Sequence, residues 1–356
     1  MKILHLIAII GNSLLGLITM IVLFSIYVPP SFSPYFPLLG FLFPYTIVLH
    51  LFFVAFWLWH FKKYVVISLV CLLLSWPSAT HFLQWNSTFF EQSEDDWVVL
   101  TYNIHHGREI QEEKKEADWA KKIEEWNKFL KSYPKLDIVC LQENVKNITY
   151  PLPGLERLKH SHRCKNRGPS ILSRRPFVHT GCIDFGNSVN GAIYADVQGE
   201  NVTFRVYNVH LQSNQVSDIT QPFLKEDEMA KGENMQKIKQ VFRLYLRTAE
   251  QRAEQLEVLI AHAEQSPYPV IIAGDFNEGP HSFIYRKLRV RYTDTFKKKG
   301  RGVSSTYAGN LPFLRIDHIF HDENWETKHH QVGHLPFSDH YPVAASISYE
   351  GPSSSR

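Results

Sequence analysis

Residues 270–280 read VIIAGDFNEGP, an apolar run that ends at an acidic residue and a turn. Val270–Gly274 has the length and the β-branched composition of a buried strand, and Asp275 is the first polar side chain after it. A strand end holds a side chain accurately, and α/β enzymes place much of their chemistry there. Taken alone, Asp275-Phe276-Asn277 is equally explained as an Asx turn before Gly279–Pro280.

The same arrangement recurs along the chain, which favours a functional interpretation over an isolated turn. Further strands are predicted at 97–103, 136–142, 170–173, 192–197, 202–210, 315–320 and 341–348. Helices are predicted at 111–133 and 235–265, each with its apolar residues on one face. Polar side chains follow or end these strands, and they form the candidate set Asn103, Glu143, His210, Asp275, Asn277, Asp317, Asp339 and His340.

This candidate set contains carboxylates, carboxamides and imidazoles but no cysteine. Carboxylate and amide oxygens are the ligands preferred by hard cations such as Mg²⁺, Mn²⁺ or Ca²⁺. A cysteine-based structural zinc site is disfavoured because the sequence has no CxxC motif. The phosphate-binding GxxxxGK[ST] loop, the GxGxxG turn and the GxSxG elbow are also absent from the sequence.

Together these pieces resemble the endonuclease/exonuclease/phosphatase superfamily. The matching segments are TYNI (101–104), LQEN (141–144), SILSRRP (170–176), NVHLQS (208–213), AGDFNEGP (273–280), LRIDHIF (314–320) and SDHYPV (338–343). In its SDHYPV segment and its apolar N-terminal part, the chain is similar to membrane-anchored bacterial members, particularly those of Bacteroidetes. The resemblance implies a four-layer α/β sandwich, in which two mixed β-sheets pack face to face and helices flank both outer faces.

The resemblance also implies a divalent metal site. Glu143 would be the principal ligand of a Mg²⁺ or Mn²⁺ ion, with Asn103 close to the metal or holding its water. Asp317 would support the metal–phosphate site, and Asp339 belongs to the same predicted set.

The catalytic roles implied by the resemblance fall on the remaining residues. His340 would be the imidazole beside the scissile phosphate, with Asp339 fixing its tautomer. Asp275 would orient the attacking water, and Asn277 would donate its amide to a phosphate oxygen. His210 would contact the phosphate or protonate the leaving oxygen. Hydrolysis of a phosphodiester needs these parts: charge neutralisation, an in-line water and a proton for the alkoxide.

Three apolar stretches precede this domain, at His5–Val28, Tyr35–Trp59 and Tyr64–Leu83. About 20 apolar residues cross a bilayer, so about three transmembrane helices are predicted, the third being shorter and less uniform. A cleaved signal peptide is the alternative for the first stretch, but its apolar region exceeds the usual 7–15 residues. The positive-inside rule places Lys2 and Lys62–Lys63 in the cytoplasm and the rest of the chain on the outer side of a bacterial inner membrane.

The charge distribution divides the chain further. Of 38 Lys and Arg residues, three lie in residues 1–90, which contain no Asp or Glu, so the remainder carries 35 basic and 35 acidic side chains. A broadly basic nucleic-acid-binding surface is therefore not indicated. Arg286–Arg301 is locally basic, with eight Lys or Arg residues, and is explained either by contact with anionic substrate or lipid headgroups or by a solvated loop.

The predicted organisation is a membrane segment (1–85), a linker (86–96), the catalytic domain (97–349) and a polar tail (350–356). The predicted function is a membrane-anchored, metal-dependent phosphoesterase, most simply a nuclease-like phosphodiesterase. Nucleic acid, a phospholipid headgroup and a small phosphorylated molecule all remain open as substrates, and no protein partner is predicted beyond the membrane lipid. The alternative is an inactive, membrane-tethered binding domain on the same fold.

Cysteines supply a last expectation. Cys71 lies in the third apolar stretch and Cys140 in a buried strand, so both are expected to be free thiols. Cys164 and Cys182 flank the 170–173 strand, and either a disulfide in an oxidising compartment or two free thiols would suit that spacing.

Overall fold

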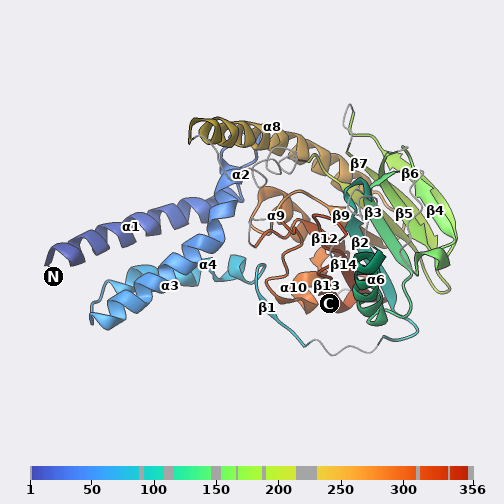
Figure 1. The fold of residues 1–356 in the computed structure, drawn as a ribbon, viewed down its shortest axis with the longest axis horizontal. Coiled ribbons are helices and arrows are strands. Elements are labelled where there is room, and N and C mark those ends of the chain that lie inside the picture. Colours follow the sequence, from blue (N-terminus) through green and yellow to red (C-terminus); the bar gives the residue numbers. More distant parts are fainter. Residues whose placement is uncertain are drawn as a thin grey trace.

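Two six-stranded sheets packed face to face form the centre of the domain that follows the N-terminal helices (Figure 1). The computed structural model describes residues 2–87, 92–107, 116–145, 154–165, 167–186, 190–213, 231–309, 313–335 and 337–351. In spatial order, the first sheet contains β10 (Thr293–Asp294), β12 (Asp317–His321), β9 (Val270–Asp275), β8 (Thr203–His210), β7 (Gly191–Gln198) and β6 (Phe177–Ile183). The second contains β13 (Trp325–Val332), β14 (Val343–Tyr349), β2 (Trp97–Asn103), β3 (Ile138–Val145), β5 (Arg167–Ser173) and β4 (His160–Arg163).

Helices cover both outer faces, so the predicted four-layer α/β sandwich is confirmed. Both sheets are mixed, because β8 pairs with β9 and β2 with β3 in parallel while their other neighbours are antiparallel. Helices α8 (Lys231–Glu264) and α9 (Phe283–Arg289) lie on the first sheet, and α6 (Glu116–Lys131) lies on the second. The predicted residues 111–115 of that last helix lie outside the described residues.

Alternation along the strands produces three separate apolar layers. In β9, Ile271 and Ala273 face the other sheet, whereas Val270 and Ile272 face helices α8 and α9. The layer between the sheets also contains Val99 of β2, whose neighbour Val98 packs toward α6 instead. Each strand therefore contributes to two layers, and the polar residues at its end lie at the rim.

Short elements connect this core. They are η2 (His105–Gly107), η3 (Leu155–Arg157), α10 (Thr295–Lys299) and β11 (Arg301–Gly302). Helix α9 begins where the Ser282 hydroxyl accepts a hydrogen bond from the Tyr285 amide, and α10 begins where the Asp294 carboxylate accepts one from the Phe296 amide.

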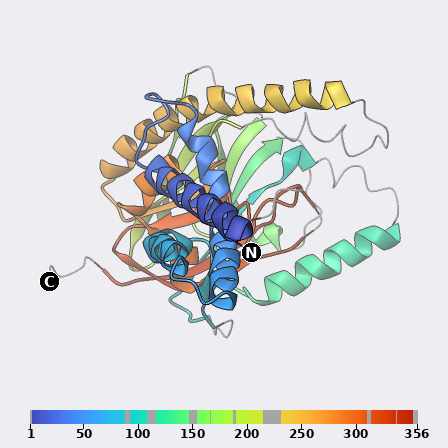
Figure 2. The ribbon, with the colours of Figure 1, turned by 90° about the vertical axis from the view of Figure 1, so that its left-hand side faces the viewer.

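The N-terminal segment forms helices that project from one side of the two-sheet domain (Figures 1 and 2). Helix α1 spans Lys2–Ser25, and α2 (Phe36–Leu39), η1 (Gly40–Leu42) and α3 (Phe43–Trp59) follow one another directly. Ile3–Ser25 and Phe36–Trp59 are long and apolar enough to cross a membrane. The expected third span is a helix, α4 (Val65–Ala79), but its 15 residues are fewer than a bilayer requires.

Buried polar side chains bond these helices to one another. Thr19 of α1 bonds the Nε2 atom of His50 on α3 at 2.9 Å, and the Nδ1 atom of His50 bonds Ser68 of α4 at 3.0 Å. The Ser68 hydroxyl donates in turn to Asn12 of α1 at 2.8 Å. All four side chains are fully buried, so the helices form one bundle rather than separate tethers.

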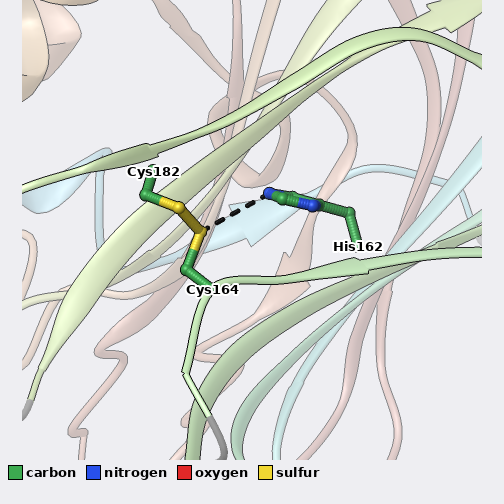
Figure 3. A group of neighbouring side chains, drawn as sticks. All are labelled: His162, Cys164 and Cys182. Carbon is green, nitrogen blue, oxygen red and sulfur yellow. Dashed lines mark hydrogen bonds between the residues drawn. A yellow bond between two sulfur atoms is a disulfide. The ribbon is translucent and has the colours of Figure 1, made fainter.

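Cys164 and Cys182 form a disulfide, with Cα atoms 6.1 Å apart (Figure 3). Cys164 directly follows β4, at the edge of one sheet, and Cys182 lies in β6, at the edge of the other. Cys71 and Cys140 are free and buried, as expected. His162 lies 3.5 Å from the Cys164 sulfur, but both sulfurs are used in the bond, which leaves no thiolate for a metal there.

Candidate active site

The register of the first sheet brings three of the candidate side chains to one level. Asp275 at the end of β9 is paired with His210 at the end of β8 and with Asp317 at the start of β12. The Nε2 atom of His210 lies 3.6 Å from Oδ2 of Asp275. Parallel and antiparallel neighbours thus deliver their polar ends to the same edge of the sheet.

The second sheet contributes the opposite wall of the site. The Asn103 amide, at the end of β2, donates to Oδ2 of Asp275 at 3.0 Å and to Oε1 of Glu143 at 3.3 Å. Oε1 of Glu143 is 3.9 Å from Nε2 of His210. One carboxamide therefore joins carboxylates from the two sheets.

His340 is held by Asp317, which differs from the pairing that the sequence predicted. Both Asp317 oxygens face the His340 Nδ1 atom, at 2.9 and 3.2 Å, so the opposite nitrogen turns toward Asp275, 3.8 Å away. Asp339, expected to fix that tautomer, instead lies 3.6 Å from Nδ1 of His105. Residues 337–339 form a turn and a bend before the isolated bridge at His340, so the side chains of Asp339 and His340 meet different partners.

The pKa values in the site are shifted because several ionisable side chains lie close together in a buried place. Burial acts to lower the pKa of His340, but the carboxylates of Asp317 and Asp275 outweigh it and hold the pKa well above its usual value. Burial raises the pKa of Asp275, and the Asp317 charge adds to that rise. Burial acts against ionisation of Glu143 as well, yet His210 and the other nearby donors hold its pKa below the ordinary value.

The backbone is strained where these side chains converge. His105, His106, Glu143 and Asn277 all have φ between 46° and 55°, a region that L-residues rarely adopt. Strain of this kind clusters at active sites, where the surrounding structure enforces it. The His106 ring contacts Glu143 twice, with Nε2 3.2 Å from Oε2 and Nδ1 3.2 Å from the carbonyl oxygen. The sequence analysis assigned no role to His105 or His106.

The loop after Asp275 is held by the predicted residue Asn277 and by two residues that the sequence analysis missed, Glu278 and Arg252. Asn277 donates its amide to the Leu211 carbonyl at 3.2 Å, and its backbone N–H donates to Asp275. The next residue, Glu278, is buried and accepts from the guanidinium of Arg252 on α8 at 2.7 and 2.9 Å. Arg252 lies three residues after Ala249 and four before Leu256, so a charge on the apolar stripe was the available signal.

The donor set suits a divalent cation. The Glu143 carboxylate lies in the site, and Asp339 contacts the adjacent His105. Asn103 turns its NH2 group toward Glu143 and Asp275, while its amide oxygen accepts a hydrogen bond from the His105 N–H at 3.0 Å. Asp275, Asp317 and His340 also place one ligand atom each within 4.8 Å of one another. The Nε2 atom of His210 is buried and has no hydrogen-bond partner among the described residues, which is consistent with a place for a bound group. Oxygen-rich sites of this kind suit Mg²⁺ or Mn²⁺.

A family model described as the endonuclease/exonuclease/phosphatase family matches residues 100–340. The chain belongs to this family. A second model, described as a domain of unknown function (DUF8431), matches residues 2–82. No curated protein matches the chain.

Solved structures of low sequence identity also match the chain. An endonuclease/exonuclease/phosphatase from Bacteroides vulgatus is 18% identical, with a TM-score of 0.51 over 72% of this chain and 99% of its own. Humanized D. rerio TDP2 is 16% identical, with a TM-score of 0.49 over 72% of this chain and 100% of its own. The human Nocturnin catalytic domain with bound sulfate is 16% identical, with a TM-score of 0.49 over 73% and 97%.

Proposed function

We propose that the chain is a membrane-anchored, divalent-metal-dependent phosphodiesterase. The observation that carries the proposal is the contact of Asn103, Glu143, His210, Asp275, Asp317 and His340 from both sheets in a single buried site. Its family consists typically of phosphodiesterases, nucleases and phosphatases, which fits these side chains. Glu143, Asn103 and Asp339 would hold Mg²⁺ or Mn²⁺, and the bound ion would neutralise charge on the phosphate oxygens.

The protein's own groups would divide the remaining work between them. Asp317 keeps the His340 ring oriented with Nε2 toward the substrate, and the raised pKa keeps that ring protonated near neutral pH. The imidazolium then donates a hydrogen bond to a phosphate oxygen. Asp275 accepts a hydrogen bond from the attacking water and so aims it in line with the leaving oxygen.

Two further groups would complete the site. His210 Nε2 has no hydrogen-bond partner in the described structure, and we assign it to the leaving alkoxide, to which it donates a proton. Asn277 uses one amide proton on Leu211 and retains a second for a phosphate oxygen.

The experiment is hydrolysis of bis(p-nitrophenyl) phosphate by the purified full chain. Activity is expected to stop with EDTA and to return with Mg²⁺ or Mn²⁺. Glu143→Ala should raise the Mg²⁺ concentration needed, and His340→Ala should lower turnover by about 10²–10⁴-fold. Full turnover in EDTA would refute the metal-dependent mechanism, and wild-type turnover of both variants would refute the roles assigned to Glu143 and His340. Absence of turnover by the wild type would favour an inactive binding domain.

For the anchor, we propose that the helical bundle crosses the bacterial inner membrane and places the catalytic domain outside. The short helix α4 must then make the third crossing within the bundle, where Ser68 bonds it to α1 and α3. Lys2, Lys62 and Lys63 belong to the end of the bundle remote from the domain, where the His5 and His60 rings lie 5.0 Å apart. The Cys164–Cys182 disulfide suits an oxidising compartment. Protease added to spheroplasts should digest the domain, and protection until the membrane is lysed would reverse this topology.

A further inference from the structure

The basic segment that the sequence left unexplained lies beside the ends of the helical bundle. Arg286 of α9 stacks on the Tyr27 ring, just beyond the end of α1, with 4.4 Å between the guanidinium carbon and the ring centre. The Lys297 ammonium, on α10, donates to the Thr80 carbonyl directly after α4, at 3.3 Å. Figure 1 places α9 and α10 on the side of the domain from which the bundle projects.

Among the described residues, few acidic side chains oppose the charge on this face. Asp294, the one acidic residue within 286–301, is buried against Arg315 and does not reach the surface. Lys287 and Arg291 pair with glutamates of α8. The excess positive charge is therefore carried by the other Lys and Arg residues of 286–301. Burial and the nearby Arg289 and Lys297 lower the pKa of His81 to about 3, which reflects the same positive field.

The length of the helical bundle determines where the basic face lies relative to the bilayer. The 24 residues of α1 extend about 36 Å, which covers a hydrocarbon core of about 30 Å and reaches the headgroups. A side chain that touches Tyr27 or Thr80 therefore lies at headgroup depth. Exposed Phe32 and Tyr35, in the connection between α1 and α2, have the aromatic character expected at that depth.

We propose that Arg286, Arg289 and Lys297 form a binding surface for the phosphate groups of anionic phospholipids, which seats the catalytic domain on the membrane. The inference rests on the proposed anchoring but not on the proposed catalysis. Arg286 and Arg289 supply bidentate donors and Lys297 a point charge, the usual recognition of a lipid phosphate. The occupant is lipid because the surface adjoins the bundle ends at headgroup depth, where bilayer phosphates are concentrated.

The test compares two lipids around the full chain reconstituted in phosphatidylcholine bilayers. The association of spin-labelled phosphatidylglycerol is measured relative to that of spin-labelled phosphatidylcholine. A preference of at least about fivefold is expected, the value for one Lys or Arg at an anionic surface. The triple variant Arg286→Gln, Arg289→Gln, Lys297→Gln should bring the ratio close to one.

The matched control removes the same charge from exposed positions on α6, as Lys121→Gln, Lys128→Gln, Lys131→Gln, and should keep the wild-type ratio. Equal association of both lipids with the wild type, or an equal fall in both variants, would overturn the binding surface. Thermal unfolding shows that each variant is folded. Flotation of the wild type with neutral vesicles reports the anchor separately, so failure of the anchor is distinguished from failure of lipid selection.

Discussion

Replacing Arg252 with methionine is expected to destabilise the catalytic domain by about 3–5 kcal/mol, the cost of breaking a buried ion pair. The guanidinium is fully buried and donates twice to Glu278, at 2.7 and 2.9 Å, and once to the Gln212 carbonyl at 3.1 Å. A methionine side chain has most of the length of arginine but no hydrogen-bond donors. The Glu278 carboxylate would then retain only the Tyr245 hydroxyl, at 3.2 Å, as its hydrogen-bonding partner among these groups.

Urea unfolding of the purified chain measures this loss directly. In a thermal scan a domain of this size shifts by about 2–4 °C per kcal/mol, so the midpoint should fall by roughly 6–20 °C. Arg252→Met combined with Glu278→Met should recover much of the stability, because no uncompensated charge remains. A loss below about 1 kcal/mol in the single variant, or a double variant less stable than either single one, would show that the ion pair does not hold this loop.

Three other predictions concern separate parts of the domain. Asp317→Asn should reduce turnover nearly as much as His340→Ala, whereas Asp339→Asn should instead weaken Mg²⁺ activation; equal metal dependence of the two Asn variants would contradict the pairing seen here. Cys164→Ser should destabilise the domain by about 3 kcal/mol, and wild-type urea stability under oxidising conditions would exclude a structural role for the bond. Burial opposes ionisation of Asp294, but Arg315 lowers its pKa to about 2. A depressed carboxyl pKa stabilises the fold above about pH 4 and loses that effect as pH falls toward 2. The loss should be about 2 kcal/mol and smaller in Asp294→Asn.

The sequence predicted the inner strands well because both of their faces are covered by apolar layers. Trp97–Asn103 was placed to the residue, and Asp275 closes β9 as expected. The strands that were not predicted include Phe177–Ile183, Trp325–Val332 and His160–Arg163. All three lie at sheet edges, where fewer apolar contacts are needed and polar, histidine-rich sequences are allowed.

The motifs indicated which polar side chains come together at the strand ends, but they did not indicate how those side chains pair. Which carboxylate meets His340 depends on the register between β12 and β9 and on the direction of residues 339 and 340, neither of which is encoded in spacing. Arg252 was missed for a related reason, since its partner lies 26 residues away on a loop. The disulfide was left open because proximity of two cysteines cannot be read from their separation.

The attachment of the domain to the helical bundle has a consequence for the proposed activity at a membrane. β1 (Gln84–Trp85), just after the bundle, pairs with β11, and the Arg315 guanidinium, close to Asp317 in the chain, donates to the His81 carbonyl at 2.9 Å. A domain on a flexible linker sweeps a hemisphere whose radius grows with the square root of linker length. A domain joined to its anchor by strand pairing keeps one height and moves only with the lateral diffusion of the bundle. Encounters then become a two-dimensional search, in which surface density of substrate, rather than its bulk concentration, sets the rate.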